Sequence, residues 1–398
     1  MTCYLSYHRT ECQRPTIDHL PAPTLLQIVP SLGAGGLARA TLDAAQAVIA
    51  AGGAAYVASP NGNMVPDLLR LRATYLEMPE EAHPAWSRFS MPGRIASILR
   101  GTRIDVVQAR SPSSAWIAGA LARRISAKWI ATLHRPFDPR GLTGGFIERR
   151  QKRADALIAV SDHVADEWRQ RAPTLGERLE TISPGINLDR FDPALVRVER
   201  VIRIAKELRV PDGRHVILCP ARLNDDQGQK ILIEAVKRLG RDDVFCLLLG
   251  STDGPTPFEK ELEDAIEDAE LFGRVQIGPY VDDMPATYML SDVVVSTAGA
   301  RQGFSRALIE AQAMGRPVVA VDGGAAAEAM VAGVTGWVAP EGDPAALTAA
   351  LDAALSLSAE RRAELARNAQ DHVRSHYSLV DSNRRMLELY HRLGASAV

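Results

Sequence analysis

The sequence predicts an α/β protein built from two doubly wound, parallel-sheet domains. Short apolar runs such as Val106 to Ala109 are nearly continuous, which is typical of strands buried on both faces. These runs alternate with helical patterns, and the alternation occurs twice, before and after a turn-rich segment at 181–193. At 398 residues the chain is too long for one ordinary core and suits two domains of roughly 180 residues each.

The first domain is expected at 23–195, after a loose polar tail at 1–22. Its opening strand, Thr24 to Val29, is followed by a glycine loop, Ser31 to Gly36, and a helical run at 37–51. Strand, glycine loop and helix in this order form a Rossmann-like opening. Later strands are predicted at 54–59, 106–109, 129–133 and 156–160, and helices at 92–101, 113–125 and 145–154.

Two features of this domain bear on function. Gly33, Gly35 and Ala38 satisfy the loose G-x-G-x-x-[GA] pattern, but the second strand ends in Ser59-Pro-Asn-Gly, without the acidic residue that a dinucleotide site needs. An NAD enzyme is therefore not favoured. His134 follows a predicted strand, at the sheet edge where open α/β sheets bind ligands. It suits either a substrate contact or an ordinary polar loop position.

The second domain is expected at 196–375, followed by a C-terminal helix at 376–398 that packs back on the first domain. Its predicted strands lie at 216–219, 244–249, 275–277, 293–295 and 318–321, and its helices at 228–239, 257–270, 284–290, 305–314, 324–332 and 344–370. Two such domains leave a cleft between their strand ends.

The stretch Asp292 to Gly324 is the centre of this second domain. It passes from a buried strand through a small-residue loop into a helix that opens near Ser305, a natural N-cap residue. Glu310 follows in the second turn. Because a helix N-terminus attracts anions and a carboxylate accepts from hydroxyls, the stretch suits a phosphate and a sugar.

Charge is uneven along the chain. Residues 1–200 hold 25 Lys and Arg against 19 Asp and Glu, whereas the rest hold 21 against 29. A basic first half suits anionic lipid, a phosphorylated substrate or nucleic acid, and a solvated surface is the plainer explanation. The same alternatives, lipid head group or solvated helix face, hold for the cluster that consists of Arg140, Arg149, Arg150, Lys152 and Arg153.

Cysteine usage and hydropathy indicate the compartment. The four cysteines share no Cys-x-x-Cys spacing, which is typical of a reducing compartment. Cys3, His8, Cys12 and His19 fit no zinc pattern, so no metal is expected. No apolar run approaches the ~20 residues of a membrane span. We therefore expect a cytoplasmic protein, at most peripheral to the inner membrane.

Taken together, these motifs resemble the family 4 retaining glycosyltransferases of the GT-B fold, from Thr24 to about Leu393. The segments that carry the resemblance keep their order and spacing. They are Ser31–Gly36, Asp105–Ser111, Thr132–His134, Ile158–Ser161, Ile182–Asn187, Ala221–Leu223 with Gly228, Gly278–Val281, Gly303–Glu310, and Gly323-Gly324 with Glu328.

The resemblance implies a retaining hexosyltransferase that needs no metal or other cofactor and binds no nucleic acid. Its second domain would hold a nucleotide-sugar donor, and its first a glycan or lipid-linked acceptor of the lipopolysaccharide or exopolysaccharide type. The implied catalytic residues are His134, Arg222, Gln302 and Glu310. The implied donor-binding residues are Gly35, Gly36, Gln227, Gly250, Tyr280, Gly303, Phe304, Ser305 and Arg306.

The chain departs from the family pattern at four positions. Gln227 stands where the family usually has a lysine, and Gln302 stands where it has the first of two glutamates. Ser305 and Ala38 replace a glycine and a glutamate. Loss of the lysine removes a positive charge from the leaving diphosphate, a role that Arg301 or Arg306 would have to take over. Two hypotheses follow: an active transferase, or a catalytically weakened protein that binds nucleotide sugar or acts as an interaction subunit.

Overall fold

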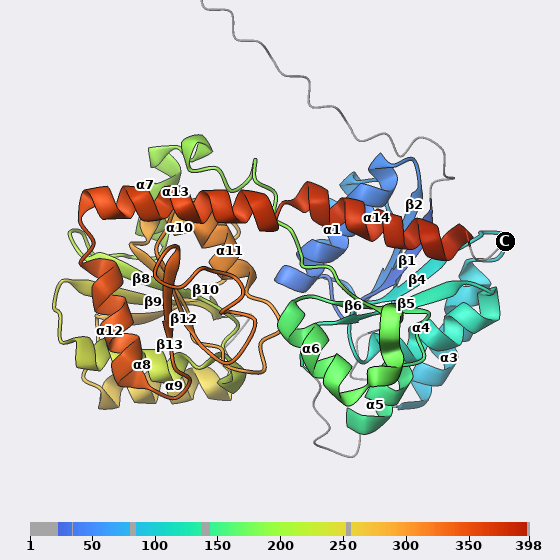
Figure 1. Cartoon of the computed structure of the whole chain (residues 1–398), viewed down its shortest axis with the longest axis horizontal. Coiled ribbons are helices and arrows are strands. Elements are labelled where there is room, and N and C mark those ends of the chain that lie inside the picture. Colours follow the sequence, from blue (N-terminus) through green and yellow to red (C-terminus); the bar gives the residue numbers. More distant parts are fainter. Residues whose placement is uncertain (1–22, 34, 80–84, 137–143, 252–255, 396–398) are drawn as a thin grey trace, which may run out of the picture.

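The computed structural model describes residues 23–33, 35–79, 85–136, 144–251 and 256–395. The expected tail at 1–22, with Cys3, His8, Cys12 and His19, lies outside the described residues, as does Arg140. The structure confirms the predicted fold class: two parallel sheets, each covered by helices, lie side by side (Figure 1).

The first sheet has seven parallel strands in the order β3-β2-β1-β4-β5-β6-β7. The strands are β1 (Thr24–Ile28), β2 (Ala54–Ser59), β3 (Thr74–Glu77), β4 (Val106–Ala109), β5 (Lys128–Leu133), β6 (Ala156–Ala159) and β7 (Leu179–Thr181). The helices between them are α1 (Gly36–Ala50), α2 (Val65–Arg70), α3 (Ala85–Ile98), α4 (Ser114–Ile125), α5 (Gly144–Gln151) and α6 (Asp162–Arg171). The four central strands β1, β4, β5 and β6 are more fully buried than β2, the fifth inner strand, which explains their continuous apolar sequences.

The second sheet has six parallel strands in the order β10-β9-β8-β11-β12-β13. The strands are β8 (His215–Pro220), β9 (Val244–Ser251), β10 (Val275–Pro279), β11 (Val293–Ser296), β12 (Val318–Val321) and β13 (Gly336–Ala339). The helices are α7 (Val198–Glu207), α8 (Gln229–Leu239), α9 (Pro257–Asp268), α10 (Met284–Leu290), α11 (Arg306–Ala313), α12 (Pro344–Leu355) and α13 (Ala359–His376).

The topology marks where ligands bind. Sequence order reverses between β1 and β4 in the first sheet and between β8 and β11 in the second. Crevices at the carboxyl ends of strands form at such switch points. The loops after β1, β4 and β5 face the loops after β8 and β11, so the two switch points contribute to one site.

The last helix joins the two halves. α13 lies along the second sheet, and α14 (Leu379–Ala395) continues from it over the first, as the two red helices of Figure 1 show. α14 packs against α1, and the Tyr390 hydroxyl donates to Gln108 Oε1 on β4 at 2.6 Å. Because Leu387, Leu389 and Tyr390 belong to the apolar core of the first sheet, this helix fastens the second half to the first.

Two predicted helices were wrong. Residues 324–332 form turns, because the Ala325 amide donates to the carbonyl of Gln302 and the next bonds link residues three apart. The helix predicted at 344–370 is broken between α12 and α13, where Ser358 accepts from the Arg361 amide and begins a new helix.

Within the described residues, no helix is both long and apolar enough to cross a bilayer.

Candidate active site

A cavity lies between the two sheets at their carboxyl ends. It consists of two adjacent chambers of 310 and 490 Å³, whose walls share Gly36, Arg222 and Arg306. All of the implied catalytic and donor-binding residues line one chamber or both. The first chamber contains Gly36, His134, Arg222, Gln227, Gln302, Gly303, Phe304, Ser305 and Arg306, and the second adds Gly35, Gly250, Tyr280 and Glu310. The structure thus brings the predicted residues together, and their individual roles remain predictions.

Arg222 enters the cavity from the loop after β8. The Gln229 side chain donates to its carbonyl at 2.9 Å and fixes the backbone. The absence of a side chain at Gly250 allows the loop with Arg222 to lie against β9, because a Cβ at 250 would sit 1.9 Å from the Ala221 carbonyl oxygen. The guanidinium of Arg222 is exposed and pairs with no carboxylate in the described part of the chain. Its donors are therefore available to an anion.

Helix α11 begins at the floor of the cavity. Ser305 occupies its N-cap position, as predicted, but makes no capping hydrogen bond. Its hydroxyl instead points toward Ser296 Oγ at 3.5 Å, and Ser296 donates to Gln302 Oε1 at 3.2 Å. The amides of the first turn therefore keep their hydrogen-bonding capacity for a ligand.

Glu310 is buried and engaged on both oxygens. Arg306 donates to Oε1 at 2.8 Å, and the Tyr288 hydroxyl donates to Oε2 at 3.0 Å. Arg306 also reaches Asp43 on α1 at 3.6 Å, across the boundary between the two sheets. Burial raises the pKa of Asp43, and the positive charge of Arg306 is the largest of the effects that lower it. Sequence reasoning named Arg306 and Glu310 but missed Asp43 and Tyr288.

His134 follows β5 and faces the cavity as a neutral imidazole. Burial, reinforced by the charge of Arg110, lowers its pKa to about 3. Its Nε2 is shielded from solvent and has no hydrogen-bond partner among the described residues. A neutral ring with one unused nitrogen can accept from, or donate to, a sugar hydroxyl.

Arg110 is the buried support behind His134. It follows β4, donates from Nε to Gln27 Oε1 at 2.8 Å, and donates to the Ala40 carbonyl at 3.2 Å. Burial lowers its pKa, and the charge of Asp43 counteracts this. Arg110 lies within the segment Asp105–Ser111 that carries the family resemblance, and the sequence assigns no role to it.

Gln227 lies beside a set of charges that spans the cavity. The Asp226 carboxylate accepts from Arg135 of the first half at 3.2 Å and from Arg301 of the second at 3.4 Å. The backbone carbonyl of Gln227 accepts from the Thr297 hydroxyl at 2.7 Å. Two guanidinium groups, those of Arg135 and Arg301, line the same chamber as Gln227.

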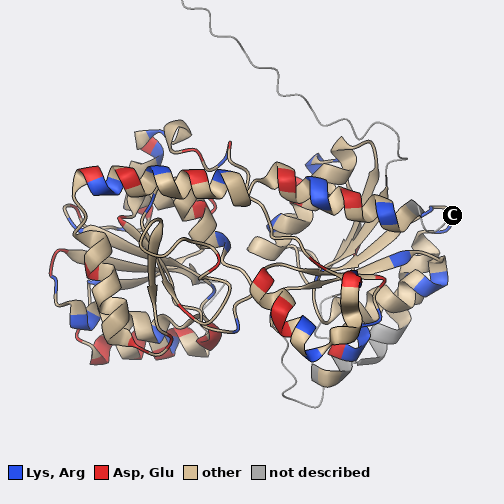
Figure 2. Ribbon diagram, viewed as in Figure 1, with Lys and Arg blue, Asp and Glu red and all other residues tan. Residues whose placement is uncertain are grey.

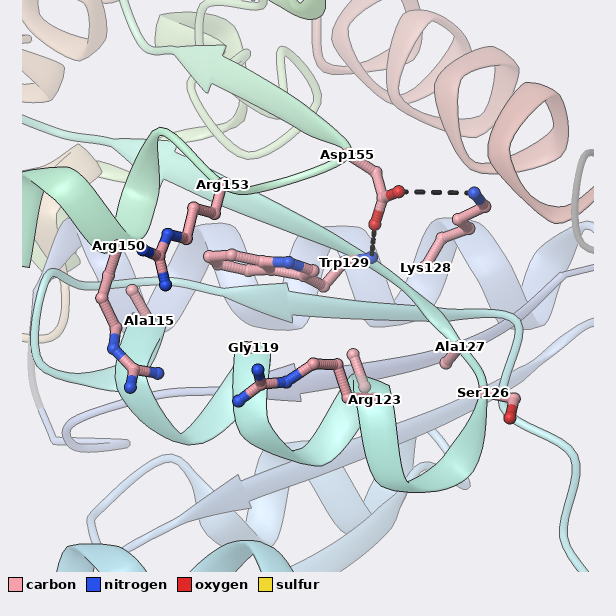
Figure 3. A pocket seen from close by; sticks show the side chains of 11 residues that line it. Ala115, Gly119, Arg123, Ser126, Ala127, Lys128, Trp129, Arg150, Arg153 and Asp155 are labelled. Carbon is pink, nitrogen blue, oxygen red and sulfur yellow. Dashed lines mark hydrogen bonds and ion pairs between the residues drawn. The ribbon is translucent and has the colours of Figure 1, made fainter.

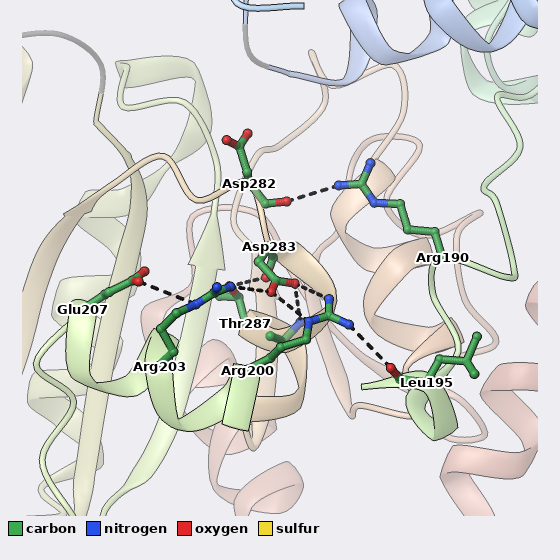
Figure 4. Close-up of polar contacts among 9 residues, drawn as sticks. Arg190, Leu195, Arg200, Arg203, Glu207, Asp282, Asp283 and Thr287 are labelled. Carbon is green, nitrogen blue, oxygen red and sulfur yellow. Dashed lines mark hydrogen bonds and ion pairs between the residues drawn. The ribbon is translucent and has the colours of Figure 1, made fainter. Parts of the chain in front are cut away.

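Tyr280 lies in the cavity wall, and the two residues Asp282 and Asp283 that follow it are held by arginines. Asp283 caps α10 and pairs with Arg200 at 2.5 Å and Arg203 at 3.0 Å, both on α7 (Figure 4). Arg190 donates to the Asp282 carbonyl at 3.1 Å. These bonds fix the loop that carries Tyr280, whose pKa is raised by burial.

Comparisons with known proteins decide the family. The sequence model described as Glycosyltransferase Family 4 matches residues 34–190, and the model described as Glycosyl transferases group 1 matches residues 201–372. A crystal structure of a glycosyltransferase from Rickettsia africae superimposes with a TM-score of 0.82 at 26% identity, covering 93% of this chain and 98% of that one. The chain is a family 4 glycosyltransferase of the GT-B fold.

Two curated relatives of this glycosyltransferase are informative. A D-inositol 3-phosphate glycosyltransferase from Salinispora tropica is 28% identical over 75% of this chain and 68% of its own length. A putative colanic acid biosynthesis glycosyltransferase, WcaL, from Escherichia coli K12 is 26% identical over 61% and 58% respectively. The Anabaena protein HepE, solved with UDP and glucose, shares the fold with a TM-score of 0.81 at 21% identity, covering 92% of this chain and 99% of that one.

Proposed function

We propose that this glycosyltransferase moves a hexose, with retention, from a nucleotide-sugar donor to a cell-envelope glycan or a lipid-linked acceptor. The observation that carries the proposal is a cavity whose walls hold the open N-terminus of α11, the buried carboxylate of Glu310, and Arg222, which pairs with no carboxylate among the described residues. The helix N-terminus and Arg222 suit a diphosphate, and Glu310 suits ribose hydroxyls. The names of the relatives, an inositol phosphate and an exopolysaccharide glycosyltransferase, support the class of acceptor.

The chemistry follows from charge. As the bond between the sugar carbon and the diphosphate oxygen breaks, negative charge grows on the leaving group, and Arg222 with the α11 amides stabilises it. The acceptor oxygen attacks the same face, and its proton passes to the departing phosphate oxygen. No metal is required if these cationic and backbone donors supply the neutralisation. His134, neutral and on the opposite wall, binds a hydroxyl of the transferred sugar.

The second candidate is a protein that binds nucleotide sugar without transferring it. Gln227 and Gln302 favour it, and so does the occupation of Glu310 by Arg306 and Tyr288. A ribose must share or displace these partners. In either case the nucleotide donor places the protein in the cytoplasm, and a lipid-linked acceptor would bring it to the inner membrane.

The decisive experiment mixes the purified protein with UDP-, GDP- and ADP-sugars and measures donor hydrolysis and nucleotide binding. Turnover with one donor supports the transferase, and binding without turnover supports the second candidate. Absence of both contradicts the proposal. Arg222→Ala should lower donor binding or turnover at least about tenfold, since it removes charge-assisted hydrogen bonds to the diphosphate. Arg214→Ala, on the loop before β8 and outside the cavity walls, is the matched control.

The positions of Arg135 and Arg301 beside Gln227 lead to a second prediction, which concerns the cation at the leaving group. We expect Arg301→Gln to reduce turnover on the order of tenfold or more, because it removes a cation beside the leaving group. Gln227→Lys in that background should recover part of the loss. If Arg301→Gln has no effect on turnover, the cation that replaces the family's lysine is not Arg301.

A further inference from the structure

A second cavity lies at the opposite edge of the first sheet, away from the active site. It has a volume of 580 Å³ and lies along α4, from Ala115 to Ser126, beside the C-terminal end of α5 and the beginning of β5 (Figure 3). Lys128 and Trp129 start β5 at this cavity, whereas His134 follows the other end of the same strand. A strand of this length spans roughly 17 Å, so a ligand here cannot touch a donor bound at His134.

The walls of this cavity are strongly cationic. Arg123, Arg150, Arg153 and Lys128 line it, and Asp155 is the carboxylate among its lining residues. Asp155 is already engaged, since it accepts from Lys128 at 3.3 Å and from the Trp129 amide at 3.0 Å. Neither Arg123 nor Arg153 forms an ion pair with any carboxylate of the described residues. The wall therefore carries more positive charge than the carboxylates of the described residues neutralise.

The arginines around this cavity are not explained by their positions at helix ends alone. Basic residues are common in the last turn of a helix, where they offset the dipole, and Arg123 and Arg150 have that position on α4 and α5. Here, however, the side chains lie around one space beside the Trp129 indole (Figure 3). Arg150 stacks on Trp116 with its carbon 3.4 Å from the ring centre, which limits how far it can turn away.

The electrostatics agree with the geometry. Burial lowers the pKa of Arg150, and the charges of Arg123 and Arg153 lower it further. Like charges held this close raise the free energy of the empty site, and a polyanion between them would relieve the repulsion. Figure 2 shows Lys and Arg on α4 and α5, in the half of the chain that has the basic excess.

We propose that this cavity is a binding site for a phosphate group, separate from the donor site, in which Arg123 and Arg153 bind the anion and Arg150 completes the positive wall. The guanidinium fork of each of the two anion-binding arginines matches the oxygens of a phosphate. The phosphate belongs either to a soluble phosphorylated molecule or to the head group of a membrane lipid.

The test compares two double variants of the full chain. Arg123→Gln with Arg153→Gln removes two guanidinium groups from the cavity, and Arg124→Gln with Arg149→Gln removes two neighbours on α4 and α5 that do not line it. Inorganic pyrophosphate is titrated by calorimetry at low and high salt. Vesicles of phosphatidylcholine, with and without phosphatidylglycerol, are tested by cosedimentation. Arg222→Ala identifies any pyrophosphate bound in the active site, because that binding should weaken in this variant alone.

The wild type should bind pyrophosphate, the anionic vesicles, or both, with an affinity that falls as salt rises. The cavity variant should lose at least about tenfold in affinity, and the control pair should keep it. Binding of pyrophosphate alone identifies a soluble ligand, and binding of anionic vesicles alone identifies a lipid. No binding to either probe, or equal loss in the two double variants, would overturn the proposal.

Discussion

The imidazole of His134 lies within the charge field of Arg110 and away from bulk solvent, which favours its neutral form. Its pKa is about 3 in the folded chain, against an ordinary value of 6.5. The unfolded chain therefore binds a proton between these values while the folded chain does not. Stability from this group is fully present above pH 6.5 and is lost as the pH falls toward 3.

We expect the free energy of unfolding to fall by about 2 kcal/mol between pH 7.5 and pH 5 through His134 alone, by the linkage between proton binding and stability. His134→Asn should remove this component, so that its unfolding free energy depends less on pH over that interval. Urea unfolding at the two pH values measures it. His376→Asn, at an exposed site on α13, should keep the wild-type dependence. An unchanged pH dependence in His134→Asn would contradict a buried, neutral His134.

The residues of the site could be predicted as a set, but their pairings could not. A strand end identifies His134 and a helix start identifies Glu310, because these signals are local in sequence, whereas Arg222 was named through the family resemblance. Arg306 was considered as a replacement cation for the leaving group. In the structure it pairs with Glu310 on its own helix and with Asp43, which is more than 200 residues away in the chain. A contact of that range depends on how two domains meet, which no local pattern encodes.

At the scale of elements, the buried strands were predicted well, and of the four edge strands β10 was predicted while the other three were missed. β3, β7 and β13 each end a sheet, and their residues are partly exposed. Their apolar runs are therefore short and interrupted, and periodicity cannot separate them from loops. β4 and α10, by contrast, begin and end at the predicted residues.

Asp283 shows how one element positions the site. It caps α10, accepting from the Ala286 amide at 3.3 Å, and binds two arginines of α7. We expect Asp283→Ala to lower the free energy of unfolding by about 1–2 kcal/mol, as the loss of an N-cap does, and to weaken donor binding by loosening the Tyr280 loop. Urea unfolding and donor titration measure the two effects.

The matched control for this change is Asp282→Ala at the adjacent position. Asp282 contributes its backbone carbonyl, and its side chain points away from the arginines (Figure 4). Its unfolding free energy should stay within about 0.5 kcal/mol of the wild type. Equal losses in the two variants would mean that Asp283 has no special part in holding α10.

At the scale of the whole molecule, the site exists only while the two halves stay together. Besides the Arg306 contact to Asp43, the Glu328 carboxylate accepts from the Asp162 amide at 3.0 Å and from the amide of His163. These amides begin α6, so a carboxylate of one half caps a helix of the other. The cavity walls come from both halves, and any separation of the halves would divide the cavity.

Gly303 is where the two halves approach most tightly around His134. A Cβ at 303 would lie 2.1 Å from the His134 carbonyl oxygen and 2.9 Å from Val164 Cγ2, both in the first half. The φ angle of Gly303 is not in the left-handed region, so the backbone conformation at 303 is compatible with alanine. The added methyl group would therefore prevent only the close contact with His134 and Val164. We expect Gly303→Ala to hold the halves apart, increase the radius of gyration in small-angle scattering, and reduce turnover on the order of 10²-fold through misplaced groups. Gly93→Ala, which meets no atom within 4 Å, should change neither. A Gly303→Ala protein with wild-type scattering and turnover would show that the observed approach of the halves is not the catalytic one.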